Sequence, residues 1–247
     1  MNFFKLLPAL ILASVLYSCK KDKAPDSVPV EFPTTSYVNL AAYDRSGKPN
    51  NLIMPRDVVS PTMQTYITTT LPEEKDLRTT YPELLTTQAI ADIKITASSD
   101  VFITYVSQGA GLTNTVAFYT YPTGQSPTKT TDIQKITYVF PNAGSGTPLV
   151  SGDKVKIGRF SAGTSIGFVL LQNGWNAQSN TINNRTVHFL SNDALNPEVS
   201  PDLKKHAVLI NYAPENKVLI GFEDLNRTLP LCDHDFNDVV FFATVTP

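Results

Sequence analysis

The segment from Glu223 to Asp238 concentrates side chains whose types and spacing suit a cation site. It holds five carboxylates, with Asn237 between the last two: Glu223, Asp224, Asp233, Asp235 and Asp238. Two such negative charges about 4 Å apart repel by about 1 kcal/mol in bulk water, and by about 4 kcal/mol at an effective dielectric constant near 20. These residues must therefore either point into solvent or surround a positive charge.

Alternate spacing within "DHDFND" indicates calcium chemistry. Asp233, Asp235 and Asn237 reproduce the D-x-D-x-N opening of an EF-hand loop. The remainder of that loop is absent, because Asp238 stands where the EF-hand has glycine and Thr244 where it has glutamate. Calcium takes roughly six to eight oxygen ligands, and a compact acidic turn supplies several of them. The pattern predicts a calcium site that is not an EF-hand.

Further ligands would come from the strand that precedes the loop. If the runs at residues 217–225 and 238–245 pair as a hairpin, Glu223 and Asp224 reach the same rim of the sheet as the acidic turn. Asn114 stands just before another expected strand. Its side-chain oxygen either joins this rim or serves a turn.

Two other interpretations of the acidic loop stay open. Asx-turns could hold its side chains in solvent, or two carboxylates could act as acid and base in glycoside hydrolysis. Zinc is not expected, since Cys232 and His234 stand alone and His188 and His206 lie on separate expected strands. We expect His206 to be a hydrogen-bonded core or edge histidine. The sequence has no nucleophile elbow, phosphate loop or cofactor motif, so no catalytic residue and no enzyme activity is expected.

The chain from Asp92 onward consists of short runs rich in Val, Ile, Thr, Tyr and Phe, separated by turn residues. The runs cover residues 92–97, 101–108, 114–122, 134–142, 153–161, 164–172, 185–191, 206–213, 217–225 and 238–245. This pattern predicts an all-β fold, an antiparallel jelly-roll-like β-sandwich over residues 92–247. "IGFVLL" and "VVFFATV" are apolar at successive positions, which is typical of central strands buried on both faces.

Residues 37–91 are expected to form a short, partly helical extension of this sandwich. Ser60 and Pro61 are typical of a helix start, as N-cap and first helical residue. Met63, Tyr66 and Ile67 follow at helical spacing, which predicts one or two helical turns. "YVNLAAYDRSGKPNNLI" predicts a strand and a turn.

Three aromatic residues are candidates for ligand stacking. Trp175, the single tryptophan, lies in an expected loop, and Tyr119 and Tyr121 lie on an expected strand. Exposed rings at these positions could stack on a sugar, whereas buried rings would fill the end of the sandwich core.

The N-terminus predicts the cellular compartment. Residues 1–18 have the lysine, short apolar stretch and small residues of a secretory signal, and "VLYSC" resembles the lipobox of bacterial lipoproteins. This resemblance implies a lipid on Cys19, followed by a flexible tether at residues 19–36 and attachment to the outer membrane, on its periplasmic side or at the cell surface. The alternative is an ordinary secretory signal with an incidental cysteine. A net charge of −2 without basic clusters argues against a nucleic-acid partner.

Several spaced motifs together resemble the bacterial domain-of-unknown-function 4114 family. "IGFEDL" and "CDHDFNDVVF" are similar to its G-F-E-D and D-x-D-[FY]-N-D patterns, and further stretches extend the similarity over roughly residues 98–245. "LPEEKDLRTTYPELL" resembles the region before this domain in lipoproteins of the Bacteroidetes type. The resemblance implies a secreted or surface β-sandwich, is consistent with calcium at the acidic motif, and assigns no reaction. "LNRTLPLC" replaces the short glycine-rich link that is common in the family.

These observations lead to one expected function and two alternatives. We expect a lipid-anchored outer-membrane protein whose calcium-binding sandwich binds a glycan or another surface component, as adhesion modules do. A hydrolase that acts on polysaccharide through paired carboxylates is the first alternative. A purely structural surface protein without a ligand is the second.

Overall fold

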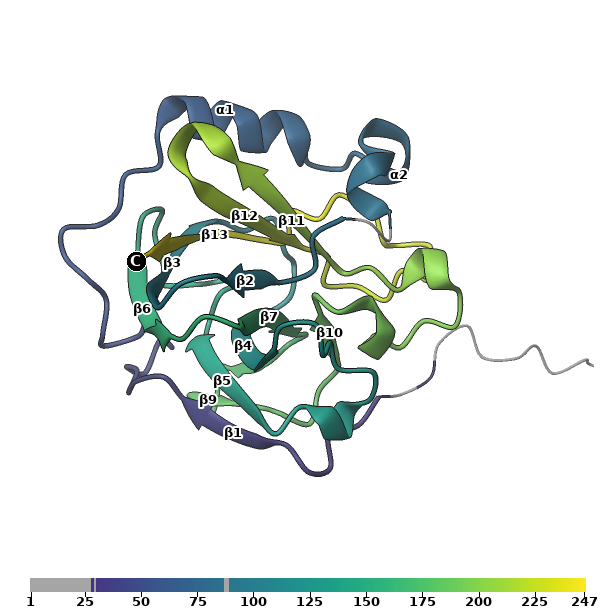
Figure 1. Cartoon of the computed structure of the whole chain (residues 1–247). Helices are drawn as coiled ribbons and strands as arrows, with labels where there is room; N and C mark the ends of the chain where they lie inside the picture. Colours follow the sequence, from purple (N-terminus) through teal and green to yellow (C-terminus); the bar gives the residue numbers. More distant parts are fainter. Residues whose placement is uncertain (1–27, 29, 87–88) are drawn as a thin grey trace, which may run out of the picture.

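Figure 1 shows a computed structural model of the chain, which describes residue 28, residues 30–86 and residues 89–247. The predicted signal peptide at residues 1–18, Cys19 and most of the predicted tether at residues 19–36 lie outside the described part. In that part, the structure has no helix of sufficient length and apolar character to cross a bilayer.

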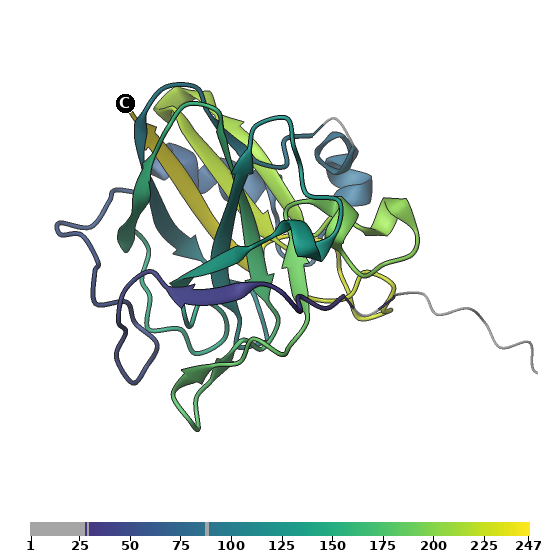
Figure 2. The same cartoon turned by 60° about the horizontal axis from the view of Figure 1, so that its bottom comes forward.

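The described strands form two main sheets. The first has the order β1 (Ser36–Asn39), β5 (Lys135–Phe140), β4 (Thr115–Pro122), β7 (Thr164–Leu171) and β10 (His188–Leu190), with β2 (Ile93–Ile95) also paired to β7. The second has the order β11 (Ala207–Tyr212), β12 (Lys217–Phe222), β13 (Val239–Thr246), β3 (Ser99–Ser107) and β6 (Lys154–Phe160). Pairings among the described strands are antiparallel except that β1 runs parallel to β5 at the edge of the first sheet (Figure 2).

The predicted all-β sandwich is confirmed, and all ten predicted runs contain a strand. The ribbon of β8 (Trp175–Asn176) and β9 (Thr181–Ile182) was not predicted, because two-residue strands carry almost no pattern. The helices are α1 (Pro61–Thr70), α2 (Leu77–Thr80) and the 3₁₀ turns η1 (Pro82–Leu85), η2 (Thr130–Asp132), η3 (Asp193–Leu195), η4 (Pro201–Leu203) and η5 (Ala213–Glu215).

The main core lies between the two sheets. Its large fully buried side chains are Phe140, Phe168, Phe189, Phe222 and Phe241. Phe168 of β7 meets Phe241 of β13 edge to face, with 5.3 Å between ring centroids. Each such ring contributes up to about 3 kcal/mol through burial, so this core fixes how the central strands of the two sheets face each other.

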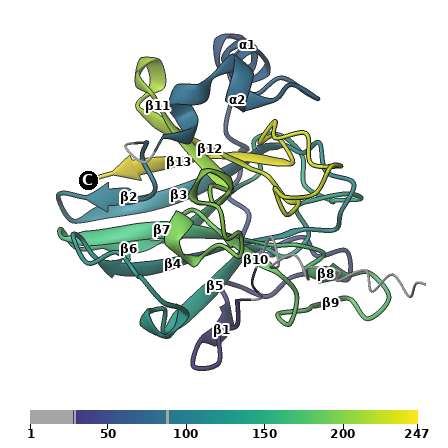
Figure 3. The ribbon, with the colours of Figure 1, turned by 90° about the vertical axis from the view of Figure 1, so that its right-hand side faces the viewer.

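Each sheet is also covered on its outer face, which explains why β7 and β13 are apolar at successive positions. Helix α1 packs Met63 and Ile67 against Val240 and Phe242 of β13 (Figure 3). On the other sheet, outward-facing side chains of β7 pack in a cluster that includes Phe32 and Tyr37 of the N-terminal segment.

Helix α1 begins where the sequence predicts. The Oγ of Ser60 accepts a hydrogen bond from the N–H of Met63 at 3.1 Å, and Pro61 occupies the first turn. The helix is ten residues long, nearly three turns, where one or two were expected. Contact with β13 overrides the weak helix propensity of its threonines.

Candidate metal centre

The hairpin of β12 and β13 brings the two acidic segments to one end of the sandwich, as predicted. Phe222 lies opposite Val239, so Glu223 and Asp238 are the next residues on either strand. The N–H of Asp224 donates to Oδ2 of Asp238 at 2.7 Å. This hydrogen bond closes the base of the loop that carries the other acidic residues.

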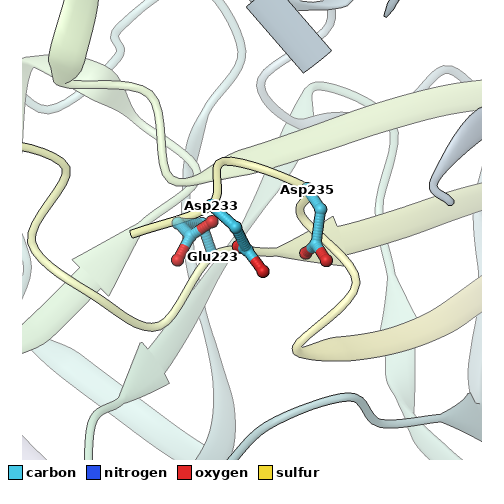
Figure 4. A group of neighbouring side chains, drawn as sticks. All are labelled: Glu223, Asp233 and Asp235. Carbon is cyan, nitrogen blue, oxygen red and sulfur yellow. The ribbon is translucent and has the colours of Figure 1, made fainter. Parts of the chain in front are cut away.

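Five carboxylates meet in two triads that share Glu223. One triad is Glu223, Asp233 and Asp235, and the other is Glu223, Asp224 and Asp238. In each triad, one oxygen of every residue lies within 4.8 Å of the oxygens of the other two. Figure 4 shows the first triad, with the side chains of Asp233 and Asp235 reaching down from the loop toward Glu223.

Most of these carboxylates are buried. Glu223 has no exposed surface, Asp224 and Asp235 are 2 % exposed, Asp238 is half-buried, and only Asp233 is exposed. Burial, followed by repulsion from neighbouring acids, raises the pKa of Glu223 to about 7 and that of Asp238 to about 10. Burial likewise raises the pKa values of Asp224 and Asp235 to about 6. The cluster therefore disfavours its own ionised form.

Hydrogen bonds satisfy part of the cluster. Asp224 Oδ2 accepts from the amide of Asn114 at 2.5 Å, and Asp235 accepts from the N–H groups of Glu74 at 2.9 Å and Asn237 at 3.0 Å. Glu223 Oε2 is buried and has no hydrogen-bond partner. No ion pair among the described residues involves any of the five carboxylates.

The loop backbone is held in an unusual conformation. His234 and Phe236 both have positive φ, 61° and 60°, at alternate positions of "DHDFN". The left-handed region costs a non-glycine residue roughly 1–2 kcal/mol, so surrounding contacts must hold it. Phe236 supplies one of them, because its ring is fully buried in the cluster beneath α1. Its carbonyl oxygen passes close over Gly221, where a side chain would collide with it.

Sequence reasoning missed the segments that brace this loop. The N–H of Leu77 donates to the carbonyl of His234 at 3.0 Å, and the N–H of Gly109 donates to that of Asn237 at 3.1 Å. Glu73 also lies beside the loop, where its charge contributes to the raised pKa of Asp235. The one signal in the sequence was the family-like stretch "LPEEKDL" at residues 71–77.

Asn114 lies at the rim, but its amide nitrogen, and not its oxygen, faces the acids. Its Oδ1 accepts from the N–H of Asn173 at 3.2 Å, which directs Nδ2 toward Asp224. Asn114 is fully buried in this position. Its described role is therefore to hold Asp224, and its oxygen is occupied elsewhere.

The three aromatic residues that were expected to stack on a ligand are buried. Trp175 is 4 % exposed and meets Tyr43 edge to face at 5.7 Å between centroids, because the segment before α1 covers it. Tyr119 and Tyr121 are 2 % and 9 % exposed. A buried ring cannot stack on a sugar, so these three residues belong to the core and its edges.

His206 is a hydrogen-bonded core histidine, as expected. Its Nε2 lies 2.9 Å from Glu198 Oε1 and its Nδ1 lies 3.1 Å from the carbonyl oxygen of Glu223. Its ring stacks on Phe189 with 3.8 Å between centroids. The histidine thus supports the backbone at Glu223 from behind the acidic cluster.

A separate cleft of about 460 Å³ lies between the N-terminal segment and the residues before β10. Phe32 and Tyr37 line it on one side, and Asn184, Arg185 and His188 on the other. Tyr37 Oη and His188 Nε2 are 2.9 Å apart, which fixes both rings. The cleft combines aromatic and polar side chains, as small-ligand sites do.

Comparison with known proteins gives a match in the C-terminal part of the chain. Residues 160–246 match the family model of DUF4114, a domain of unknown function. The matched range contains the whole acidic loop, but it is shorter than the expected range of 98–245, so β3, β4 and β5 lie outside it. No curated protein and no solved structure matches the chain.

Proposed function

We propose that this protein is a calcium-binding β-sandwich of the cell envelope whose activity is binding. Glu223 Oε2 carries the proposal, because it is fully buried, has no hydrogen-bond partner and lies among four other carboxylates. A buried, uncompensated carboxylate is strongly unfavourable. A divalent cation between these oxygens would remove both the desolvation cost and the repulsion.

The donor set favours calcium among divalent cations. Every candidate ligand is a carboxylate or amide oxygen on an irregular loop, and calcium accepts roughly six to eight such oxygens in flexible geometry. Magnesium demands a near-octahedral arrangement and retains water, whereas zinc prefers nitrogen and sulfur ligands. Calcium would join the ends of β12 and β13 and relieve the strained loop between them.

The arrangement of the acids disfavours polysaccharide hydrolysis. Within each triad the ligand oxygens lie within 4.8 Å of one another, whereas the carboxyl groups of glycosidases are about 5–10 Å apart with a sugar between them. Glu223 and Asp224 are also inaccessible to a polymer. An accessible acid pair on separate elements would favour the hydrolase.

We place the glycan-binding part of the proposal in the cleft at Arg185. Its aromatic Phe32 and Tyr37 could cover a sugar face, while Asn184 and Arg185 offer hydrogen-bond donors to hydroxyl or acidic groups. A lipid on Cys19 would anchor the protein in the outer membrane. This anchor would keep the cleft next to envelope polymers.

Calcium binding is tested by thermal melts of the whole chain in mild detergent, first in EDTA and then with added calcium. Calcium at 100 times its dissociation constant should stabilise by about 2.7 kcal/mol per site, which raises Tm by roughly 5–10 °C. Asp235→Asn combined with Asp238→Ala should abolish the rise, and Asp100→Asn, at a half-buried acid outside the cluster, should keep it. Magnesium serves as the ion control. A melt indifferent to millimolar calcium would exclude the calcium proposal.

Anchoring and glycan binding need separate measurements. A palmitate analogue should label the wild-type chain in cells but not Cys19→Ala, and the variant should leave the membrane fraction. On an array of envelope polysaccharides, binding should be lost in Arg185→Ala and kept in Arg159→Ala. Uniform failure to bind would favour the purely structural alternative.

A further inference from the structure

We propose that the rim binds two calcium ions and that the carboxylate of Glu223 bridges them. This inference rests on the proposed calcium function and specifies its stoichiometry and ligands. The inner site consists of Glu223, Asp224 and Asp238, and the outer site of Glu223, Asp233 and Asp235.

The separation of the oxygens divides the cluster into two sites. Calcium–oxygen distances are about 2.3–2.6 Å, so two oxygens on one ion are at most about 5 Å apart. The described acids satisfy a 4.8 Å limit as two sets of three and not as one set of five. One ion therefore cannot take all five acids in this arrangement, whereas two ions on either side of Glu223 can.

The two oxygens of Glu223 are available for such a bridge. Oε2 has no hydrogen-bond partner within ordinary distance, Oε1 accepts the N–H of Leu225 at 3.3 Å, which is longer than an ordinary hydrogen bond, and a further polar neighbour is the weakly donating Cys232 thiol. The side chain is fully buried, so solvent does not compensate for the missing partners. A bridging carboxylate gives one oxygen to each of two ions. In two-metal sites the ions are about 3.5–4 Å apart.

Charge balance also favours two ions. One divalent cation would leave three of the five negative charges uncompensated, and two would leave one. The guanidinium of Arg227 is 2 % exposed, has an unpartnered Nη2, and interacts electrostatically with Glu223. Its positive charge would balance the single negative charge that two calcium ions leave.

The two sites should differ in affinity. In the inner site, Asn114 holds Asp224, and the backbone of Asp224 holds Asp238. The outer site depends on Asp233, which is exposed and has no side-chain hydrogen bond among the described residues. Because a preorganised site loses less conformational freedom on binding, the inner ion should bind first and more tightly.

The experiment counts bound ions by equilibrium dialysis of the whole chain against radioactive calcium. The wild type should bind two ions in two steps. Asp233→Asn should keep only the tighter ion and Asp238→Asn only the weaker, while Glu223→Gln should weaken both by at least tenfold. Asp100→Asn, which changes a half-buried acid outside the rim, should still bind two.

The outcomes separate this inference from the calcium function itself. One ion per chain in the wild type would overturn the bridge and leave the calcium function intact, whereas no bound calcium would overturn both. If Glu223→Gln fails to fold, Asp233→Asn still decides, because Asp233 is exposed and its substitution leaves the core unchanged. Retention of both ions by that variant would also overturn the proposal.

Discussion

Two groups of buried acids near one end of the five-stranded sheet are compensated in different ways. Asp153, just before β6, is 1 % exposed and pairs with Arg56 Nε at 2.6 Å and Lys48 Nζ at 3.7 Å. The acids of the rim lie near the same end, since β6 and β13 both flank β3 there. Within the described part of the chain, they form no ion pair.

The difference shows that this fold can place a cationic side chain against a buried acid. It does so at Asp153, where the guanidinium of Arg56 lies 2.6 Å from the buried carboxylate. Exposed side chains such as Arg56 reach inward to make such pairs. Five acids without an ion pair, and with Arg227 as a cationic neighbour, therefore indicate that most of the compensating charge at the rim comes from solution.

The largest expected effect is an unusual pH dependence in EDTA. Glu223, with a pKa of about 7 in the folded state against an ordinary 4.5, binds its proton more tightly when folded. The contribution of Glu223 to stability should therefore fall by roughly 3 kcal/mol, for two to three pKa units, as pH rises from about 4.5 to 7. Asp238, with a folded-state pKa of about 10, should extend the fall above pH 7. Saturating calcium should remove this trend, because the ion displaces the proton. Melts between pH 5 and 8 measure both series, and a flat profile in EDTA would contradict the comparison.

The second prediction concerns the paired acid. Arg56→Ala leaves buried Asp153 with only the more distant Lys48, which should cost about 1–3 kcal/mol because Arg56 is itself partly exposed. The loss should be equal in calcium and in EDTA, as measured by denaturant unfolding. Arg159→Ala, at an exposed pair with Asp100, is the matched control and should leave Tm unchanged. Rescue of Arg56→Ala by calcium would show that the two regions are one site.

A smaller effect is expected where the rim is held by a neutral side chain. Asn114→Ala removes the amide that positions Asp224, which should lower calcium affinity about tenfold. Calcium titration by calorimetry measures it. Asn142→Ala removes another buried asparagine, which bonds the carbonyl of Ser46 instead, and should leave the affinity unchanged. Equal effects of the two substitutions would indicate a general loss of structure.

The smallest effect is expected between the two acidic segments. Leu231 is 85 % exposed, so Leu231→Ser should change stability by less than about 0.5 kcal/mol. Calcium affinity should also stay the same, because no ligand changes. A clear loss of affinity would place residues 225–232 among the elements that shape the site.

The sequence predicted features whose signal is local or periodic. Ten strands followed from β-type runs, the start of α1 from Ser60 and Pro61, and the convergence of the acids from the hairpin. The covering of both sheets explains why β7 and β13 looked like central strands. In each case neighbouring residues in the sequence carry the information.

Contacts between distant segments were not predictable. Glu74 and Leu77 brace the acidic loop from about 160 residues away, and nothing in their own spacing marks this role. Trp175 lies in a turn-like sequence, but residues from distant parts of the chain cover its ring. Tyr43 meets the ring edge to face, and Gly47 lies between the ring and Asn142. The residues next to Trp175 in the sequence therefore do not reveal that its ring is buried.

One contact near the start of the described chain holds that part of the chain close to the acidic loop. The N–H of Val28 donates to the carbonyl of Pro197 at 2.6 Å, and neighbouring Glu198 accepts from the N–H of Arg227 in the acidic loop. Figures 1 and 3 show the chain entering beside this loop, with the C-terminus at the opposite end.

If the chain is anchored at Cys19, eight residues lie between Cys19 and Val28, and the two positions are at most about 30 Å apart. The calcium rim and the nearby cleft would then face the bacterium's own membrane, and the strand ends around Pro247 would face away from it. The polymers that reach the cleft first would thus be those of the same envelope, which makes self-attachment a more natural role than capture of another cell.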